Sequence, residues 1–307
     1  FFGDVIVVNG IAWPKMSVNA QRYRFRLLNG SNARFYNLKL SASAQPKYPT
    51  GHKPLCPDPV FWVIGTDGGL LDKPVSTSEL FIAPSERYDV IVDFGGMQRC
   101  YVEMTNNANA PFPGGDPVDP NTNGKVMRFE VGTSQIADMS FDPSAPDAQL
   151  RGEGGNMLPP IVRLADGEGG LAAGVTPYRT RQLVLVEVEG PGGPLEVLLN
   201  NTKWSGRRYG MGDPVPGGKQ VGVLNITELP VVGSTEVWEI INLTEDAHPI
   251  HVHLGQFQLI NRQAINPDTY RALYDSQFPG GAFVPEYGPP NDYTALNGDG
   301  ALGGNPA

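Results

Sequence analysis

Short segments in which hydrophobic and polar residues alternate recur along most of the chain. A period of two is typical of β-strands that bury one face. In the first half the pattern predicts strands over Asp4–Val8, Tyr23–Leu28, Phe35–Leu40, Phe61–Ile64, Glu79–Ile82, Tyr88–Phe94, Cys100–Met104 and Val126–Val131. In the second half it predicts strands over Gln182–Val188, Leu195–Leu199, Gly222–Leu224, Val237–Ile241, Ile250–Leu254 and Phe257–Ile260. Turn residues between the segments favour an all-β sandwich or barrel.

Two interruptions of this pattern organise the chain. Residues 136–176 are rich in Pro, Gly, Asp and Ala, and they predict a linker between a β domain at 1–135 and a second one at 177–307. The length of 307 residues agrees with about two domains. A short helix is predicted over Pro267–Tyr274, with Asn266 as its N-cap and Pro267 as its first residue.

The two halves read as copies of one another, because four blocks recur in the same order. The pairs are Val8–Trp13 with Leu199–Trp204, Arg26–Asn29 with Glu239–Asn242, Ala33–Leu40 with Ala247–Leu254, and Phe61–Ile64 with Phe257–Ile260. The first copy continues through further strands to Val131, whereas nothing matching follows Ile260. A sandwich that lacks its last strands has bare edges. We therefore expect the second domain to be incomplete in this chain.

The copies also differ in polar chemistry at one place. The first has Arg34, Asn37 and Lys39 where the second has His248, His251 and His253, which are three of the four histidines. On a strand, His251 and His253 share a face with their side chains roughly 7 Å apart. That spacing suits neighbouring ions better than one ion, and His248, ahead of the strand, can point to a third place. Neutral imidazole is a ligand for copper, zinc and iron.

Charge, hydropathy and cysteine usage limit the classes of partner and the compartment that suit this chain. The net charge of −9 argues against nucleic acid, and no apolar run approaches the length of a membrane span. Cys56 and Cys100 either form one disulfide, which indicates an oxidising compartment, or remain two thiols.

Asp246, close to His248, could accept a hydrogen bond from a ligand, although a solvated loop residue is the simpler interpretation.

Several motifs resemble three-domain multicopper oxidases of the laccase type, nearest to the branch of spore-coat laccase, bilirubin oxidase and phenoxazinone synthase. The motifs are His248–Leu254, Val8–Gly10 with Trp13-Pro14, Tyr23–Arg34, Asp67–Leu71 and Ala83–Asp89. The resemblance implies two cupredoxin-like domains, which are Greek-key β-sandwiches. The first half would be the copper-free middle domain of the family and the second half part of the third domain.

Carried over by this resemblance, His248 would bind the type 1 copper, His251 the type 2 copper and His253 one of the type 3 pair. The family couples oxidation of a small reducing substrate (a phenol, aminophenol, tetrapyrrole or metal ion) to reduction of dioxygen to water. It also needs an N-terminal cupredoxin domain with His-x-His motifs and a C-terminal His-Cys-His segment, and neither is in this sequence. We therefore expect the chain alone to be inactive, and its status as an enzyme stays open.

Two other classes of function compete with this interpretation. The chain could be a non-catalytic cupredoxin-like module in which the histidines are a relic or a simple metal-binding patch. A mononuclear metal enzyme of the cupin kind would need a further histidine after His253, and none follows. A location outside the cytoplasm, which means extracellular, periplasmic or spore-coat, is favoured by the family resemblance and by a Cys56–Cys100 bridge.

Overall fold

The computed structural model describes residues 2–46, 54–133, 136–153, 157–191, 193–200, 219–221, 224–226, 228–253 and 255–277. Its strands pair into separate sheets, as the alternating sequence predicts, and α1 (Pro267–Gln277) is the one helix in these residues. Contacts divide the chain into a first unit, Phe1–Val162 with Asp246–Gln256, and a second unit, Arg163–Glu245 with Phe257–Ala307. The domain boundaries expected from the sequence stay a prediction.

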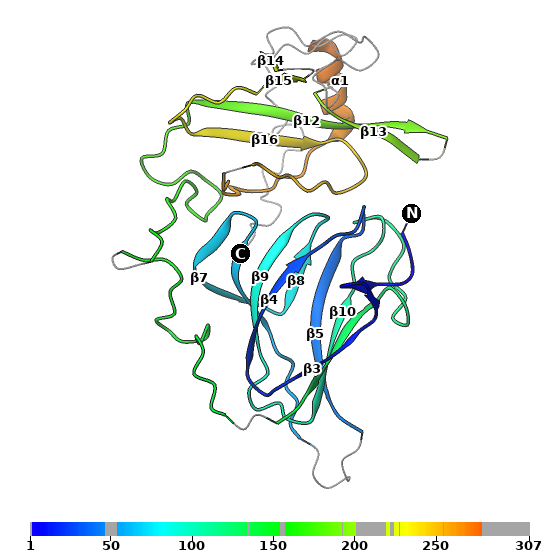
Figure 1. The fold of residues 1–307 in the computed structure, drawn as a ribbon. Helices are drawn as coiled ribbons and strands as arrows, with labels where there is room; N and C mark the ends of the chain where they lie inside the picture. Colours follow the sequence, from blue (N-terminus) through cyan, green and yellow to red (C-terminus); the bar gives the residue numbers. More distant parts are fainter. Residues whose placement is uncertain are drawn as a thin grey trace. The chain divides into compact units, whose positions relative to one another are not determined.

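The first unit is a two-layer β-sandwich (Figure 1). One sheet has the order β3-β11-β10-β5-β8, and the other has the order β4-β9-β6-β7. The strands are β3 (Lys15–Val18), β4 (Arg22–Leu28), β5 (Tyr36–Ala44), β6 (Phe61–Thr66), β7 (Gly69–Thr77), β8 (Glu79–Ile82), β9 (Arg87–Asp93), β10 (Cys100–Asn106) and β11 (Lys125–Val131). Most connections cross between the sheets, and β3 runs parallel to β11.

Alternate residues of these strands fill the space between the sheets. On β10, Cys100, Val102 and Met104 point inward while the residues between them are only partly buried. Phe25, Phe94 and Phe129 meet at ring-centroid distances between 5.2 and 6.5 Å. Burying such side chains is the main stabilising contribution to a sandwich of this size.

Cys56 and Cys100 form a disulfide, which decides between the two alternatives that the sequence left open. The bridge joins residues 44 positions apart and attaches the segment before β6 to the first residue of β10. A native crosslink of this kind usually stabilises a domain by about 2–4 kcal/mol.

The start of the first unit forms a small hairpin, β1 (Val7–Val8) with β2 (Ile11–Ala12). Asn9 and Gly10 connect the strands with φ values of 50° and 83°. This Asn-Gly pair suits the left-handed backbone of a tight hairpin turn. Asn200, which the repeat aligns with Asn9, has a φ of 51°, so the two copies share this backbone feature.

The second unit contains the sheet β13-β12-β16, in which β12 (Arg179–Gly190) pairs with β13 (Gly193–Leu199) and runs parallel to β16 (Glu236–Asn242). A separate hairpin joins β14 (Lys219–Val221) and β15 (Leu224–Ile226). The second unit has a buried apolar cluster formed by Val184, Ile241, Leu243 and Tyr270. Tyr270, which belongs to α1, is fully buried there. The Asn266 side-chain oxygen accepts a 3.0 Å bond from the Thr269 N–H, so the predicted cap and helix are confirmed.

Two of the predicted strands are wrong in the described residues. Residues 250–253 and 257–260 are extended or irregular chain without ladder pairing, and Leu254 lies outside the description. A strand persists only where neighbouring strands satisfy its N–H and C=O groups. The described part of the second unit offers 257–260 no such neighbours, and 250–253 lie against loops of the first unit. No helix in the described residues has the length and apolar character needed to cross a membrane.

Candidate metal centre

The segment that carries the histidines packs with the first unit although the sequence repeat assigns it to the second copy. The Ala247 N–H donates a 3.0 Å bond to the Phe112 carbonyl. The Ala247 side chain packs against a small apolar cluster built from Phe35, Ala83, Ala108 and Phe112. Phe35 precedes β5 and Ala108 follows β10, so the contact lies at one end of the sandwich. Loops at this end of the first unit therefore set the path of the chain just before the histidines.

His251 and His253 lie next to each other. Their ring centroids are 5.0 Å apart and the planes are inclined at 69°. The separation is shorter than the roughly 7 Å expected for a strand, because this segment is not held extended in a ladder. Both residues are exposed, whereas His248 is half-buried. Two accessible imidazoles in edge-to-face contact are nitrogen ligands suited to copper.

The ligand set is not complete within the described part of the chain. No group of three His, Cys, Asp or Glu side chains there comes together as a metal site. The structure therefore brings His251 and His253 together and does not join His248 to them as a third ligand. This arrangement fits the hypothesis that the three imidazoles serve different ions, since that hypothesis does not require them to converge.

A carboxylate lies beside His251. Asp67, in the turn between β6 and β7, has its Oδ2 atom 3.3 Å from the Nδ1 atom of His251. Asp67 Oδ1 accepts a 2.6 Å bond from the Arg87 N–H, and Oδ2 lies 3.2 Å from the Arg87 guanidinium. From the sequence, Asp67 stood out only as part of the motif Asp67–Leu71, and Asp246 was the carboxylate considered as a hydrogen-bond acceptor for a histidine ligand.

Two further titratable groups surround this carboxylate. Burial raises the pKa of Glu86, with the charge of Asp67 acting in the same direction. Burial also raises the pKa of Tyr88 to about 12, and the charges of Glu86 and Asp67 add to that increase. Asp67 and Glu86 therefore place two carboxyl groups close together here, with the Arg87 guanidinium as their neighbouring positive charge.

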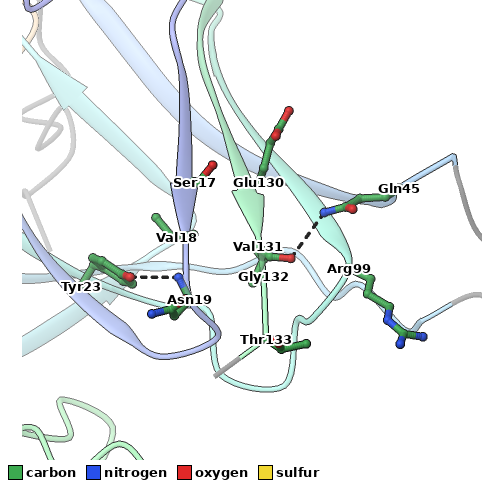
Figure 2. A pocket seen from close by; sticks show the side chains of 10 residues that line it. All are labelled: Ser17, Val18, Asn19, Tyr23, Gln45, Arg99, Glu130, Val131, Gly132 and Thr133. Carbon is green, nitrogen blue, oxygen red and sulfur yellow. Dashed lines mark hydrogen bonds between the residues drawn. The ribbon is translucent and has the colours of Figure 1, made fainter. Parts of the chain in front are cut away.

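A hollow of about 530 Å³ lies at the opposite end of the first unit (Figure 2). Its lining comes from the ends of β3, β5 and β11 and from the start of β10, and it includes Tyr23, Gln45 and Arg99. The figure shows Gln45 bonded to the Val131 carbonyl and Tyr23 bonded to the Asn19 N–H. No histidine lines it, so this hollow is separate from the histidine segment.

The family model and the related proteins that match this chain all point to multicopper oxidases. The family model described as "Multicopper oxidase" matches residues 195–297. The chain is 38% identical to "Multicopper oxidase LPR1 homolog 5" of Oryza sativa subsp. japonica over 86% of its own length and 34% of that protein. It is 32% identical to the "Laccase" of Bacillus subtilis (strain 168) over 95% of its own length and 45% of that protein. It is 30% identical to the "Bilirubin oxidase" of Albifimbria verrucaria over 87% and 38% respectively.

Solved structures agree with the sequence relatives. The crystal structure of the McoA multicopper oxidase from Aquifex aeolicus matches with a TM-score of 0.54 and 27% identity. That match covers 84% of this chain and 46% of the other. The first-unit sandwich is thus of the cupredoxin-like kind found in these oxidases, and the family implies copper as cofactor. The chain is therefore similar to laccase-like multicopper oxidases along most of its own length, and it spans less than half of the length of the relatives it matches.

Proposed function

We propose that this chain is part of a copper-dependent oxidase that couples one-electron oxidation of a small reducing substrate to reduction of dioxygen to water. The substrate classes in view are phenols, aminophenols, tetrapyrroles and reducing metal ions. The observation that carries the proposal is the pair of exposed imidazoles, His251 and His253, with ring centroids 5.0 Å apart in a chain related to multicopper oxidases.

Each histidine has a separate role in this proposal. His248 would bind the type 1 copper, His251 the type 2 copper and His253 one of the type 3 pair. Their donor chemistry suits copper because neutral imidazole nitrogens are preferred ligands of that metal. Bound copper would supply one-electron redox chemistry that side chains alone lack. The chain's own contribution is to hold the three ligands on a segment seated against Phe112 and Asp67 of the first unit.

The remaining ligands would come from elsewhere. The sequence has four histidines and two cysteines, and both cysteines are joined in the disulfide. A blue copper site needs a cysteine thiolate beside imidazoles. The proposed partners are therefore an N-terminal cupredoxin domain and a C-terminal His-Cys-His segment, on the parent polypeptide or on another chain. The isolated chain should then bind copper weakly and turn over no substrate.

Copper binding by the mass-verified chain tests the ligand assignment. We expect His251→Ala with His253→Ala to lower the copper retained after dialysis. The matched control is His52→Ala, which removes the one histidine outside the cluster and should leave the copper content unchanged. Equal copper retention by the chain and the double variant would contradict the assignment.

Oxygen uptake with a phenolic substrate tests the dependence on missing ligands. The copper-loaded chain should consume no oxygen above a copper-free sample. Sustained turnover would contradict our proposal that further ligands are required. If neither copper binding nor turnover depends on the histidines, the alternative of a non-catalytic cupredoxin-like module is the better description.

The proposed location is outside the cytoplasm, in the extracellular space, the periplasm or a spore coat. The Cys56–Cys100 disulfide supports this, because such bridges persist mainly in oxidising compartments.

A further inference from the structure

We propose that Asp67 is a positioning residue for His251. Its carboxylate accepts the Nδ1–H of the imidazole and so leaves the lone pair on Nε2, the ring nitrogen that does not face Asp67. The inference rests on the proposed function in one respect, which is that His251 is a metal ligand. It extends the site to a residue of the copy that has no histidine at the matching positions.

The geometry around Asp67 fixes its orientation. One oxygen accepts the Arg87 N–H at 2.6 Å, and the other lies 3.2 Å from the Arg87 guanidinium. The second oxygen is also 3.3 Å from His251 Nδ1, slightly longer than an ordinary N–H···O bond. The Asp67 side chain is 28% exposed and that of His251 44% exposed, so the contact is partly shielded from water. A carboxylate held at both oxygens has little freedom to turn away.

The chemistry then selects one tautomer. A neutral imidazole has one N–H donor and one acceptor nitrogen, and an ionised carboxylate only accepts. The ring nitrogen that faces Asp67 must therefore be the N–H, which places the lone pair on Nε2. A metal binds the nitrogen with the lone pair, and a carboxylate on the other nitrogen fixes the ring and raises its basicity.

The backbone beside Asp67 also holds the segment close. A Cβ built on Gly68 would lie 2.0 Å from Cγ of Gln256, so the turn and the histidine segment approach more closely than any side chain at 68 allows. Ala247 and Gln256 thus contact the first unit on either side of His251. The imidazole is fixed by its chain on both sides as well as by the carboxylate at Nδ1.

Nitrogen NMR of the metal-free chain labelled with ¹⁵N-histidine tests the tautomer directly. The spectrum is taken near pH 8.5, well above the ordinary imidazole pKa of about 6.5. Four histidines give few signals, and His251→Gln identifies the one of interest. We expect His251 to carry its proton on Nδ1. A His251 signal protonated on Nε2 overturns the proposal, and this measurement needs no variant at Asp67.

Asp67→Asn sharpens the test. The amide oxygen can still accept the Arg87 N–H, while the amide NH₂ presents donors to His251 and favours a proton on Nε2. The matched control is Glu103→Gln, which removes a charge from an exposed ion pair with Arg128 on β10 and β11. The His251 tautomer should change in Asp67→Asn and stay unchanged in Glu103→Gln. An unchanged tautomer in folded Asp67→Asn overturns the proposal.

Copper titration separates this inference from the proposed function. Asp67→Asn should weaken copper binding by about tenfold, the lower end of the usual effect of such partners, and Glu103→Gln should not. If His251→Gln leaves copper affinity unchanged, the proposed function fails while the tautomer result still stands. If His251→Gln weakens binding and Asp67→Asn does not, the positioning role fails and the ligand assignment stands.

Discussion

The segment Ala33–Leu40 and its counterpart Ala247–Leu254 share a sequence pattern and differ in structure. In the first, β5 lies between β10 and β8, and Leu38 and Leu40 are buried in the core. In the second, residues 250–253 form no strand. The comparison shows that an alternating pattern becomes a strand only where at least one neighbouring strand pairs with it.

The polar positions of the two segments are used differently as well. Arg34, aligned with His248, is buried and donates a 3.0 Å bond to the Gly3 carbonyl. Lys39, aligned with His253, forms an ion pair with Glu79. The first copy thus commits its polar side chains to contacts within the fold. The second copy leaves the His251 and His253 rings exposed, where they can bind an ion.

The largest difference in stability between the two units should come from removing one partner of an ion pair. In the second unit, Arg181 and Glu236 form two bonds of 2.6 and 3.0 Å and are only 6% and 5% exposed. Glu236→Gln should cost about 3 kcal/mol of unfolding free energy, because it removes the carboxylate charge that accepts both hydrogen bonds from the buried guanidinium. Glu103→Gln breaks the exposed pair with Arg128 in the first unit and should cost less than about 1 kcal/mol. Urea unfolding measures both, and equal losses would contradict the contrast.

The same pair predicts a pH dependence. The hydrogen bond from Arg181 lowers the pKa of Glu236 below its ordinary value of 4.5. The resulting stabilisation is complete above the unfolded pKa and is lost as pH falls through the lower folded pKa. The difference in unfolding free energy between the chain and Glu236→Gln should therefore shrink on acidification below about pH 4.5. A difference that grows there would show that the sign is wrong.

Replacing the aligned residues Asn29 and Asn242 should give a difference in stability of intermediate size. Both accept a 3.0 Å bond from the N–H two residues on, so both copies turn in the same way after β4 or at the end of β16. Asn29 is only 4% exposed and also donates to two carbonyls, whereas Asn242 is exposed. Asn29→Ala should cost about 2–3 kcal/mol because buried carbonyls lose their donor, and Asn242→Ala less than about 1 kcal/mol. Thermal unfolding of the two variants ranks them.

Disturbing the contact between Gly68 and Gln256, where the histidine segment packs against the turn after β6, should cost less stability. Gly68→Ala places a Cβ against Gln256 and should cost about 1–2 kcal/mol. Gln256→Ala removes the atoms in the way, so the double variant should recover most of the loss. The exposed Gln256→Ala alone is the control and should change stability by less than about 0.5 kcal/mol. A double variant as unstable as Gly68→Ala would show that this contact does not limit the approach.

Ionisation of the Tyr88 hydroxyl should have no effect on stability at neutral pH, because the group stays protonated there in both the folded and the unfolded chain. It lies in the stretch after Phe61–Ile64 that the second copy lacks, and burial raises its pKa to about 12 from an ordinary 10.0. The unfolded chain loses this proton first, so stability should fall as pH rises from about 10 to about 12. Tyr88→Phe should remove that part of the alkaline loss. Tyrosinate absorbance during an alkaline titration gives the midpoint, and a midpoint near 10 for Tyr88 would contradict the prediction.

Most of the first sandwich could be predicted from the sequence because its strands alternate between clear turn residues. Two strands of its sheets were missed for separate physical reasons. β3 (Lys15–Val18) is short and has only two apolar residues. β7 (Gly69–Thr77) contains Pro74, which argues against a central strand but is tolerated at the edge of a sheet, where β7 lies.

The candidate ligands could be singled out from the sequence, whereas their surroundings could not. Three histidines within six residues are a local signal, so His248, His251 and His253 stand out without a structure, and their binding of copper stays a prediction. Asp67 is distant in sequence and reaches His251 only because the histidine segment packs against the first unit. The predicted strand over Ile250–Leu254 was wrong for the same reason, since periodicity does not say which partners are present.

The environment of Asn29 has a consequence for glycosylation. Asn29-Gly30-Ser31 is an acceptor tripeptide for N-linked glycans in secreted proteins. In the folded chain, however, the Asn29 amide nitrogen donates to the Arg34 and Ile82 carbonyls and is shielded from solvent. A sugar attached there would displace both bonds and could not fit in the interior. Expressed through a secretory pathway, the chain should fold with Asn29 bare, or carry a glycan at Asn29 only in molecules that fail to fold.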